Sequence, residues 1–338
     1  MKFSPSTAEL QTVLERELSD YWGTPAKIAR LLRRPSEYRT SFALEVLTIV
    51  LETGQQVDCI FKNLSWRALL EDAQQVKPRF LHNPRREPEI YRAVLQDAPP
   101  GTATCFGVYI NEQLDKYWLF LEKVAGLELY QIGDFEQWLC VARWLAQLHD
   151  QFAGRREQLK ERTALLVYDA DFFRLWPQRA AYFAKMSARP EQRNQHRALT
   201  WLAARYENVV EQLIALPTTL IHGEFYASNV LVKDERGSVR ICPVDWEMAG
   251  IGPGLLDLAA LTAGKWREEQ RHALARAYYE ASTNNRVGTW KDFLRSLDYC
   301  RLHLAMQWLG WSPKWKPPAE NAHDWLGEAL GLAERLAL

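Results

Sequence analysis

Two neighbouring stretches decide the fold predicted for this chain: LIHGEFYASNVLV at residues 220–232 and VRICPVDWE at residues 239–247. In the first stretch, Asn229 stands five positions after Glu224. In the second, Asp245 follows an apolar run that is typical of a strand. The residues between the two stretches favour a hairpin, so we expect the three side chains to lie near one another.

These three groups suit phosphoryl transfer. One carboxylate, Glu224, would orient the acceptor hydroxyl or accept its proton, while the amide oxygen of Asn229 and the carboxylate of Asp245 would hold Mg²⁺ against the phosphates of ATP. Positioning and charge neutralisation supply most of the rate in such reactions. We therefore predict Glu224, Asn229 and Asp245 as catalytic residues, with Asn229 and Asp245 also serving as metal ligands.

The same residues resemble the aminoglycoside phosphotransferase and choline kinase-like group, which is related to the protein kinases. The resemblance rests on HGE at residues 222–224 followed by Asn229, on VDWE at residues 244–247, and on a glycine-rich turn within residues 250–259 that ends in Asp-Leu-Ala. It covers most of the chain, and it is strongest over residues 220–264.

The resemblance implies an α+β, bilobal protein-kinase-like fold. Residues 1–122 would form a small β-rich nucleotide-binding lobe, and residues 123–338 a large, mainly helical lobe for catalysis and substrate binding. It also implies a phosphotransferase that uses Mg-ATP and a small-molecule hydroxyl substrate, such as an aminoglycoside-like, sugar-like or amino-alcohol acceptor.

One residue departs from the family pattern, because Glu224 stands where the family has a catalytic Asp. The carboxylate is kept but lies one methylene further from the backbone, and a general base must be within hydrogen-bond reach of its proton. Two alternatives therefore stay open: a weak or inactive nucleotide-binding pseudokinase or scaffold, and a different chemistry on the same fold, such as nucleotidyl transfer or transfer to a protein acceptor.

A lysine–glutamate pair is the next expectation from the resemblance. Lys62 ends the strand-like run CIFK, and Glu87 opens a predicted helix, with Glu89 as the fallback partner. Strand alternation places Ile60 on the same face as Lys62, toward the adenine.

The nucleotide should also meet two loops. The segment PSEYRTS at residues 35–41 is the candidate phosphate-covering loop; it has no glycine, but Ser36, Thr40 and Ser41 could bind phosphate through hydroxyl and amide groups. The break after a strand at Glu122 and Val124 resembles the kinase hinge, whose backbone would meet adenine.

Apolar spacing predicts the remaining elements. Helices are expected at residues 7–20, 87–95, 134–152, 169–186, 196–216 and from 255 onward, and strands at residues 42–51, 57–62, 103–110 and 117–121.

The amino-acid composition excludes some functional classes and indicates the cellular compartment. The 338 residues carry 42 basic and 42 acidic side chains, which argues against a general nucleic-acid binder. The five cysteines are widely spaced and lack metal-site spacing, so free thiols in a reducing, cytoplasmic compartment are expected. The N-terminus is too charged for a signal peptide, and no apolar run is long enough for a membrane helix.

The acceptor and the oligomeric state stay open. Several tryptophans cluster late in the chain, among them Trp308, Trp311 and Trp315. This cluster favours either aromatic helix packing or a pocket for an apolar, ring-containing or cationic acceptor.

Overall fold

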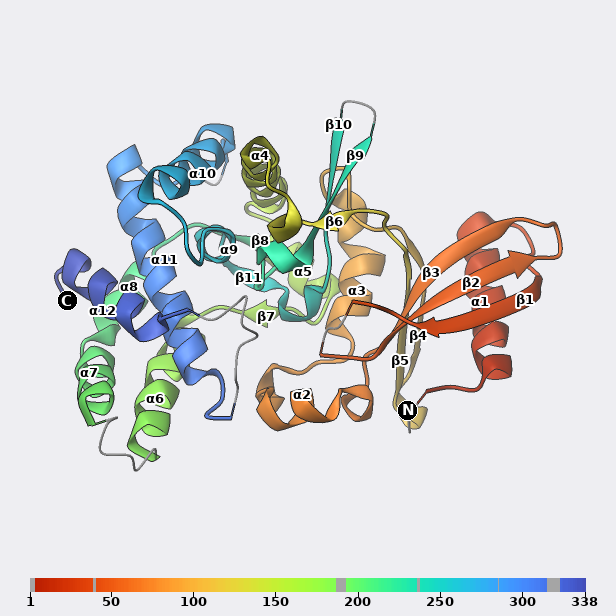
Figure 1. Ribbon diagram of the computed structural model, residues 1–338, viewed down its shortest axis with the longest axis horizontal. Helices are drawn as coiled ribbons and strands as arrows, with labels where there is room; N and C mark the ends of the chain where they lie inside the picture. The colour runs from red at the N-terminus through yellow and green to blue at the C-terminus, as the bar shows by residue number, and fades with distance from the viewer. Residues whose placement is uncertain (1–3, 39–40, 187–192, 236–237, 285, 315–322) are drawn as a thin grey trace.

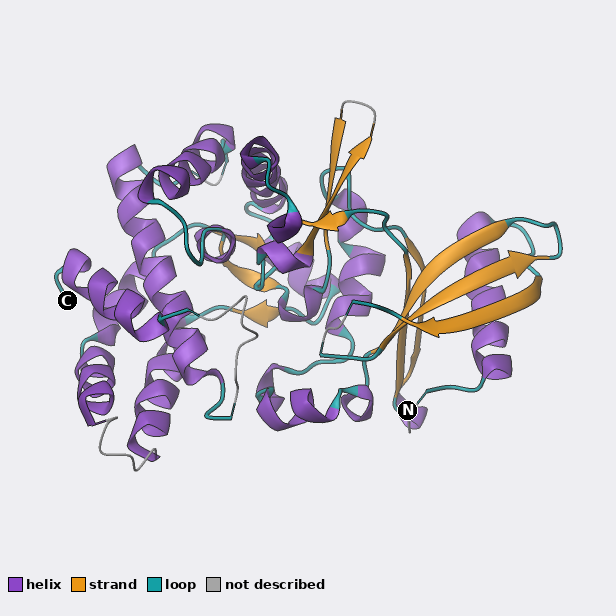
Figure 2. Ribbon diagram, viewed as in Figure 1, coloured by secondary structure: helices purple, strands orange, loops and turns teal. Residues whose placement is uncertain are grey.

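The computed structural model describes residues 4–38, 41–186, 193–235, 238–284, 286–314 and 323–338. An antiparallel sheet stands at one end of the molecule, a mass of helices fills the other end, and short strands lie between them (Figures 1 and 2). Among the described residues, none of the helices combines the length and apolar character needed to cross a membrane.

The N-terminal sheet has five antiparallel strands. Their order is β1 (Ile28–Pro35), β2 (Leu44–Leu51), β3 (Gln56–Asn63), β5 (Lys116–Glu122) and β4 (Cys105–Asn111). The strands predicted at residues 42–51 and 57–62 are β2 and β3. They pair as a hairpin in which Val46 faces Ile60 and Leu44 faces Lys62. Helices α2 (Glu71–Val76) and α3 (Arg86–Ala93) lie between β3 and β4 in the chain, and the chain leaves the sheet after β5.

One face of this sheet is sealed by helix α1 (Thr7–Trp22). The Ser6 side chain caps the helix by accepting a hydrogen bond from the backbone N–H of Glu9, and Gly23, with φ of 68°, ends it. The apolar stripe of α1 packs against Cys59 and Phe61 of β3, which are buried. Since side chains alternate along a strand, Ile60 and Lys62 point away from α1, toward the interior of the molecule.

Helices dominate the chain after β5. They are α4 (Phe135–Phe152), α5 (Arg156–Arg162), α6 (Ala170–Met186), α7 (Arg193–Ala204), α8 (Tyr206–Ile214), α9 (Leu255–Leu261), α10 (Glu268–Ala281), α11 (Trp290–Trp311) and α12 (Trp325–Leu336). The long helix α11 is central, because it packs against α6, α9 and α12.

Two small sheets lie between the helices and the N-terminal sheet. One has the order β10 (Ser238–Pro243), β9 (Val230–Glu235) and β6 (Leu127–Glu128), and the other β7 (Leu166–Val167), β11 (Gly250–Pro253) and β8 (Thr218–Ile221). Pairing of β9 with β10 confirms the hairpin expected between Asn229 and Asp245.

The predicted α+β class is confirmed, and three local expectations need correction. The segment expected as one helix at residues 196–216 is two helices, α7 and α8, separated at Arg205. The glycine-rich segment at residue 250 is strand β11 rather than a turn. Strand β1 was not predicted, because its arginines obscure the pattern; it is an edge strand, where charged side chains are common.

An ion pair joins the N-terminal sheet to the β9–β10 hairpin. The guanidinium of Arg240 on β10 donates to both carboxylate oxygens of Glu122 at the end of β5, at 2.6 and 2.8 Å. Thr104 donates to the same carboxylate through its backbone and its hydroxyl. The Arg240 guanidinium lowers the pKa of Glu122 to about 2.

We expect Arg240→Ala to lower the free energy of unfolding by about 1 kcal/mol at pH 7, since both side chains are largely buried. The folded-state pKa of Glu122 lies below its ordinary value of about 4.3. The difference between wild type and variant should therefore be complete above about pH 5 and shrink as the pH falls toward 2. Urea unfolding at several pH values measures it.

The exposed pair of Arg162 with Asp97 supplies the matched control, and Arg162→Ala should change stability much less. Equal effects of Arg162→Ala and Arg240→Ala would contradict a structural role for the Arg240–Glu122 pair.

Candidate active site

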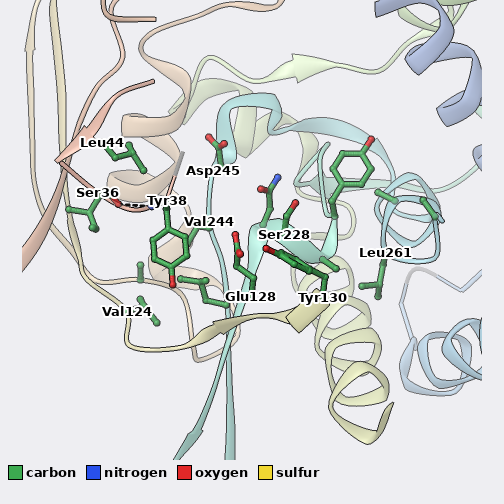
Figure 3. Close-up of a pocket in the computed structure, with 18 of the residues that line it drawn as sticks. Ser36, Tyr38, Leu44, Val124, Glu128, Tyr130, Ser228, Val244, Asp245 and Leu261 are labelled. Carbon is green, nitrogen blue, oxygen red and sulfur yellow. Dashed lines mark hydrogen bonds between the residues drawn. The ribbon is translucent and has the colours of Figure 1, made fainter. Parts of the chain in front are cut away.

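A cavity of about 900 Å³ lies between the N-terminal sheet and the helices. Leu44, Ile60 and Lys62 line it from the sheet. Asn229 and Asp245 line it from the open end of the β9–β10 hairpin, where Asn229 precedes β9 and Asp245 follows β10. Figure 3 shows Leu44 and Val124 on one side of this cavity and Leu261 on the other. Its volume is in the range of cavities that hold cofactors and small ligands.

A buried lysine organises the inner end of the cavity. The ammonium of Lys62 on β3 donates to Glu87 Oε2 of α3 at 2.6 Å and to Asp245 Oδ1 at 2.5 Å. The predicted contact between Lys62 and Glu87 is therefore present, while the fallback Glu89 instead binds Arg85 and the backbone of Ala164. Burial raises the pKa of Glu87 and of Asp245, and this effect outweighs the lowering by the positive charge of Lys62.

Glu247 extends this cluster beyond the predicted residues. One of its oxygens lies 3.5 Å from Lys62 Nζ, and the other is bound by the ammonium of Lys77. Burial acts to raise the pKa of Glu247, but the two ammonium groups outweigh it and lower the pKa to about 2. The motif VDWE pointed to Glu247, whereas no sequence pattern indicated Lys77, which stands just after α2.

A second buried network fixes the loop that precedes Asn229. The carboxylate of Asp257 accepts from the backbone N–H groups of His222 and Gly223 at 2.6 and 2.8 Å, and it also contacts His149 Nε2. His222 Nε2 lies 2.9 Å from the carbonyl oxygen of Val244, next to Asp245. Asp257, together with His149 and His222, therefore fixes the backbone of this loop.

Glycine is required at position 223. Its φ is 83°, and a side-chain Cβ there would lie 2.4 Å from both the Met248 carbonyl oxygen and the Tyr168 hydroxyl. This close approach lets the loop carrying Glu224 pass directly over the segment carrying Asp245. Asp245 itself adopts a left-handed backbone with φ of 69°, a conformation that costs free energy and is often retained at functional positions.

The predicted nucleotide contacts are partly brought together. Ile60, Ser36, Glu122 and Val124 line the cavity. Ser41 does not line it, and its carbonyl accepts from Leu70 N–H. Thr40 lies outside the described residues, as does Trp315 of the late tryptophan cluster.

Glu224 differs from the other predicted catalytic residues, because Asn229 and Asp245 line the cavity and Glu224 does not. Its side chain is half-buried. Burial, and secondarily the negative charge of Asp245, raise the pKa of Glu224 to about 8. Its backbone carbonyl accepts a hydrogen bond from the Asn229 amide nitrogen at 2.9 Å.

The donor set fits a divalent cation. Carboxylate oxygens of Glu87, Asp245 and Glu247 lie within 4.8 Å of one another. The bond from Asn229 to Glu224 uses the amide nitrogen and leaves the amide oxygen as the end of the side chain that can bind a cation. Oxygen ligands of this kind suit Mg²⁺.

Comparison with known proteins gives a match to one family. The sequence model of the phosphotransferase enzyme family, APH, matches residues 85–291. No curated protein sequence matches the chain.

Solved structures resemble this chain over nearly its whole length. A GDP complex of wild-type aminoglycoside 2'-phosphotransferase-IIIa has 12% identity and a TM-score of 0.56, covering 98% of each chain. A spectinomycin phosphotransferase complex with ADP and spectinomycin has 13% identity and a TM-score of 0.54, covering 99% of this chain and 94% of that one. A microcompartment-associated aminopropanol kinase has 16% identity and a TM-score of 0.57, covering 96% and 97%. At these identities they show the fold, which is protein-kinase-like as predicted.

We expect Lys62→Met to lower the free energy of unfolding by about 3–5 kcal/mol, because it leaves buried carboxylates without their shared cation. Loss of Lys62 should raise the carboxyl pKa values further in the folded state, and a raised carboxyl pKa costs stability as the pH rises. The destabilisation should therefore be larger at pH 8 than at pH 5, as measured by urea unfolding.

Adding Glu87→Gln to Lys62→Met should recover part of the lost stability, since one buried charge is then removed. A loss that is independent of pH and unaffected by Glu87→Gln would contradict the electrostatic account.

Proposed function

The chain belongs to the phosphotransferase enzyme family, and from that premise we propose that it transfers the γ-phosphate of Mg-ATP to a hydroxyl group of a small molecule. The observation that carries the proposal is the convergence of Lys62, Glu87 and Asp245 at the inner end of the cavity, with Asn229 on the same wall. Phosphoryl transfer uses groups of this kind, a buried cation, a carboxylate and an amide, to position a nucleoside triphosphate.

The nucleotide would occupy the part of the cavity next to the N-terminal sheet. The base would lie against an apolar surface formed by Leu44, Ile60 and Val124. Its polar edge would meet the backbone groups of Glu122 and Val124. Lys62 would reach the phosphates and Ser36 would cover them. The ADP and GDP complexes of proteins with this fold support a nucleotide in this cavity.

The division of the chain at residues 122 and 123 into a nucleotide lobe and a substrate lobe stays part of this proposal. On this division, Glu122 and Val124 lie at the crossing between the lobes, where the Arg240–Glu122 pair also lies.

In the transfer step, the acceptor oxygen forms a bond to the γ-phosphorus while the bond from that phosphorus to the β–γ bridging oxygen breaks. The acceptor proton passes to the Glu224 carboxylate, and ADP leaves with the negative charge of the bridging oxygen. Lys62 stabilises that charge because Glu87 holds its ammonium in place.

Asn229 and Asp245 would hold Mg²⁺, with Glu247 as a further oxygen donor. When bound, the ion supplies neutralisation of phosphate charge.

One observation favours a protein without catalytic activity: Glu224 is not among the residues that line the cavity. Under this second candidate function the protein would bind Mg-ATP and act as a pseudokinase or scaffold. It predicts nucleotide binding without turnover.

We expect Asp245→Asn to reduce label transfer from γ-labelled ATP by at least about a hundredfold, because charge stabilisation at the phosphates is lost. The exposed residue Glu136 gives a control of the same type, and Glu136→Gln should transfer at the wild-type rate. Full activity of Asp245→Asn would rule out the assigned role.

For the base, Glu224→Gln should lower kcat about 10²–10⁴-fold while the thermal shift caused by Mg-ATP stays close to that of wild type. If the wild type itself binds Mg-ATP without transferring phosphate, and Glu224→Asp does not create activity, the pseudokinase reading replaces the enzyme.

A further inference from the structure

The half of the cavity away from the N-terminal sheet is walled by aromatic rings. We call this part the acceptor half; its apolar lining is Tyr130, Trp138, Tyr226, Leu261, Trp308 and Trp325. Figure 3 shows Tyr130 and Leu261 beyond Ser228, on the side opposite Leu44 and Val124. Tyr130 is 50% exposed, so its ring is accessible from solvent.

The rings form a continuous row. Tyr226 and Trp308 have centroids 5.5 Å apart, and Trp308 stacks on Trp325 at 5.6 Å with 17° between the planes. Trp325 in turn meets the edge of His323 at 4.6 Å. Because each ring packs against the next, they present an extended wall, whereas a cage around a single ammonium needs rings that surround one point.

The charges of the acceptor half nearly cancel. Among the described residues, Glu128 is its one carboxylate, and Lys265 lines the same half with the opposite charge. His323 is held by Glu328, whose other oxygen accepts from Arg301 at 2.8 Å. A polycationic ligand would therefore meet an ammonium and an imidazole as well as a single carboxylate.

We propose that the acceptor is a mainly apolar, ring-bearing alcohol with at most one charge, whose ring system lies along the wall formed by Tyr226, Trp308 and Trp325. This inference rests on the proposed phosphotransferase function and specifies its substrate class. Contact with aromatic side chains supplies the binding free energy, because such surfaces bury large apolar areas and add favourable ring–ring geometry. The acceptor hydroxyl would point back toward Asn229 and Glu224.

The aromatic wall and the charges of the acceptor half both bear on selectivity. A short amino alcohol would contact only part of the wall, and an aminoglycoside would bring several ammonium groups to a half in which the described residues offer one carboxylate. The geometry therefore favours neutral ring-bearing alcohols over both classes.

The test measures binding and transfer separately on the full chain. Isothermal titration with 2-phenylethanol, 2-(2-naphthyl)ethanol, an aryl β-glucoside, kanamycin and ethanolamine, each with ADP and Mg²⁺ present, gives dissociation constants that do not depend on turnover. Label transfer from γ-labelled ATP to the same compounds gives activity. We expect the naphthyl alcohol and the aryl glucoside to bind and accept phosphate best.

Trp308→Ala should weaken binding of the naphthyl alcohol about tenfold or more and raise its KM with a smaller change in kcat. The matched control is Trp290→Ala on the same helix, because Trp290 stacks on Phe293 at 5.4 Å and does not line the cavity. Trp290→Ala should leave the dissociation constant unchanged, even if it lowers stability.

Tighter binding and faster transfer with kanamycin or ethanolamine would overturn this inference and leave the phosphotransferase function standing. If Trp308→Ala leaves the binding of ring-bearing alcohols unchanged, the inferred substrate class is wrong, while the phosphotransferase function still stands. Absence of Mg-ATP binding, or of transfer to every compound, would overturn the proposed function and this inference together.

Discussion

The structure depends on one buried ammonium group. Lys62 is 3% exposed, and a charge at such a depth is tolerated only when opposite charges surround it. Its partners come from separate parts of the chain: Glu87 from α3, and Asp245 and Glu247 from the segment after the β9–β10 hairpin. Pairing them fixes where the N-terminal sheet meets the rest of the molecule. The same requirement places the Lys62 ammonium and the carboxylates of Glu87 and Asp245 in the lining of the cavity.

The second buried network gives the cavity its other wall. Asp257 holds the backbone of His222 and Gly223, and His222 reaches the carbonyl next to Asp245. The loop ending in Asn229 and the segment of Asp245 are therefore positioned by side chains that do not themselves line the cavity. Such rigid support is what phosphoryl transfer requires, because its rate comes mainly from positioning and preorganised charge.

How much could be predicted from the sequence differs between residues. Strand alternation placed Ile60 and Lys62 on one face correctly, since one side of β3 is covered by α1. The Lys62–Glu87 contact followed from family resemblance, not from spacing. The role of Lys77 could not be predicted, because Lys77 and Glu247 are 170 positions apart and meet only in the tertiary structure. No sequence motif marks Lys77. Strand β1 was missed because edge strands carry charged side chains that hide alternation, and the Trp308–Trp325 wall required the relative placement of α11 and α12.

The most direct test of the account is to incubate the wild-type protein with Mg²⁺ and ATP labelled at either the α or the γ position, together with ring-bearing alcohols. We predict that the γ-label alone moves to the alcohol, with ADP formed in equal amount. Transfer of the α-label would show nucleotidyl chemistry on the same fold, and ATP binding with neither label transferred would contradict catalysis by this cavity.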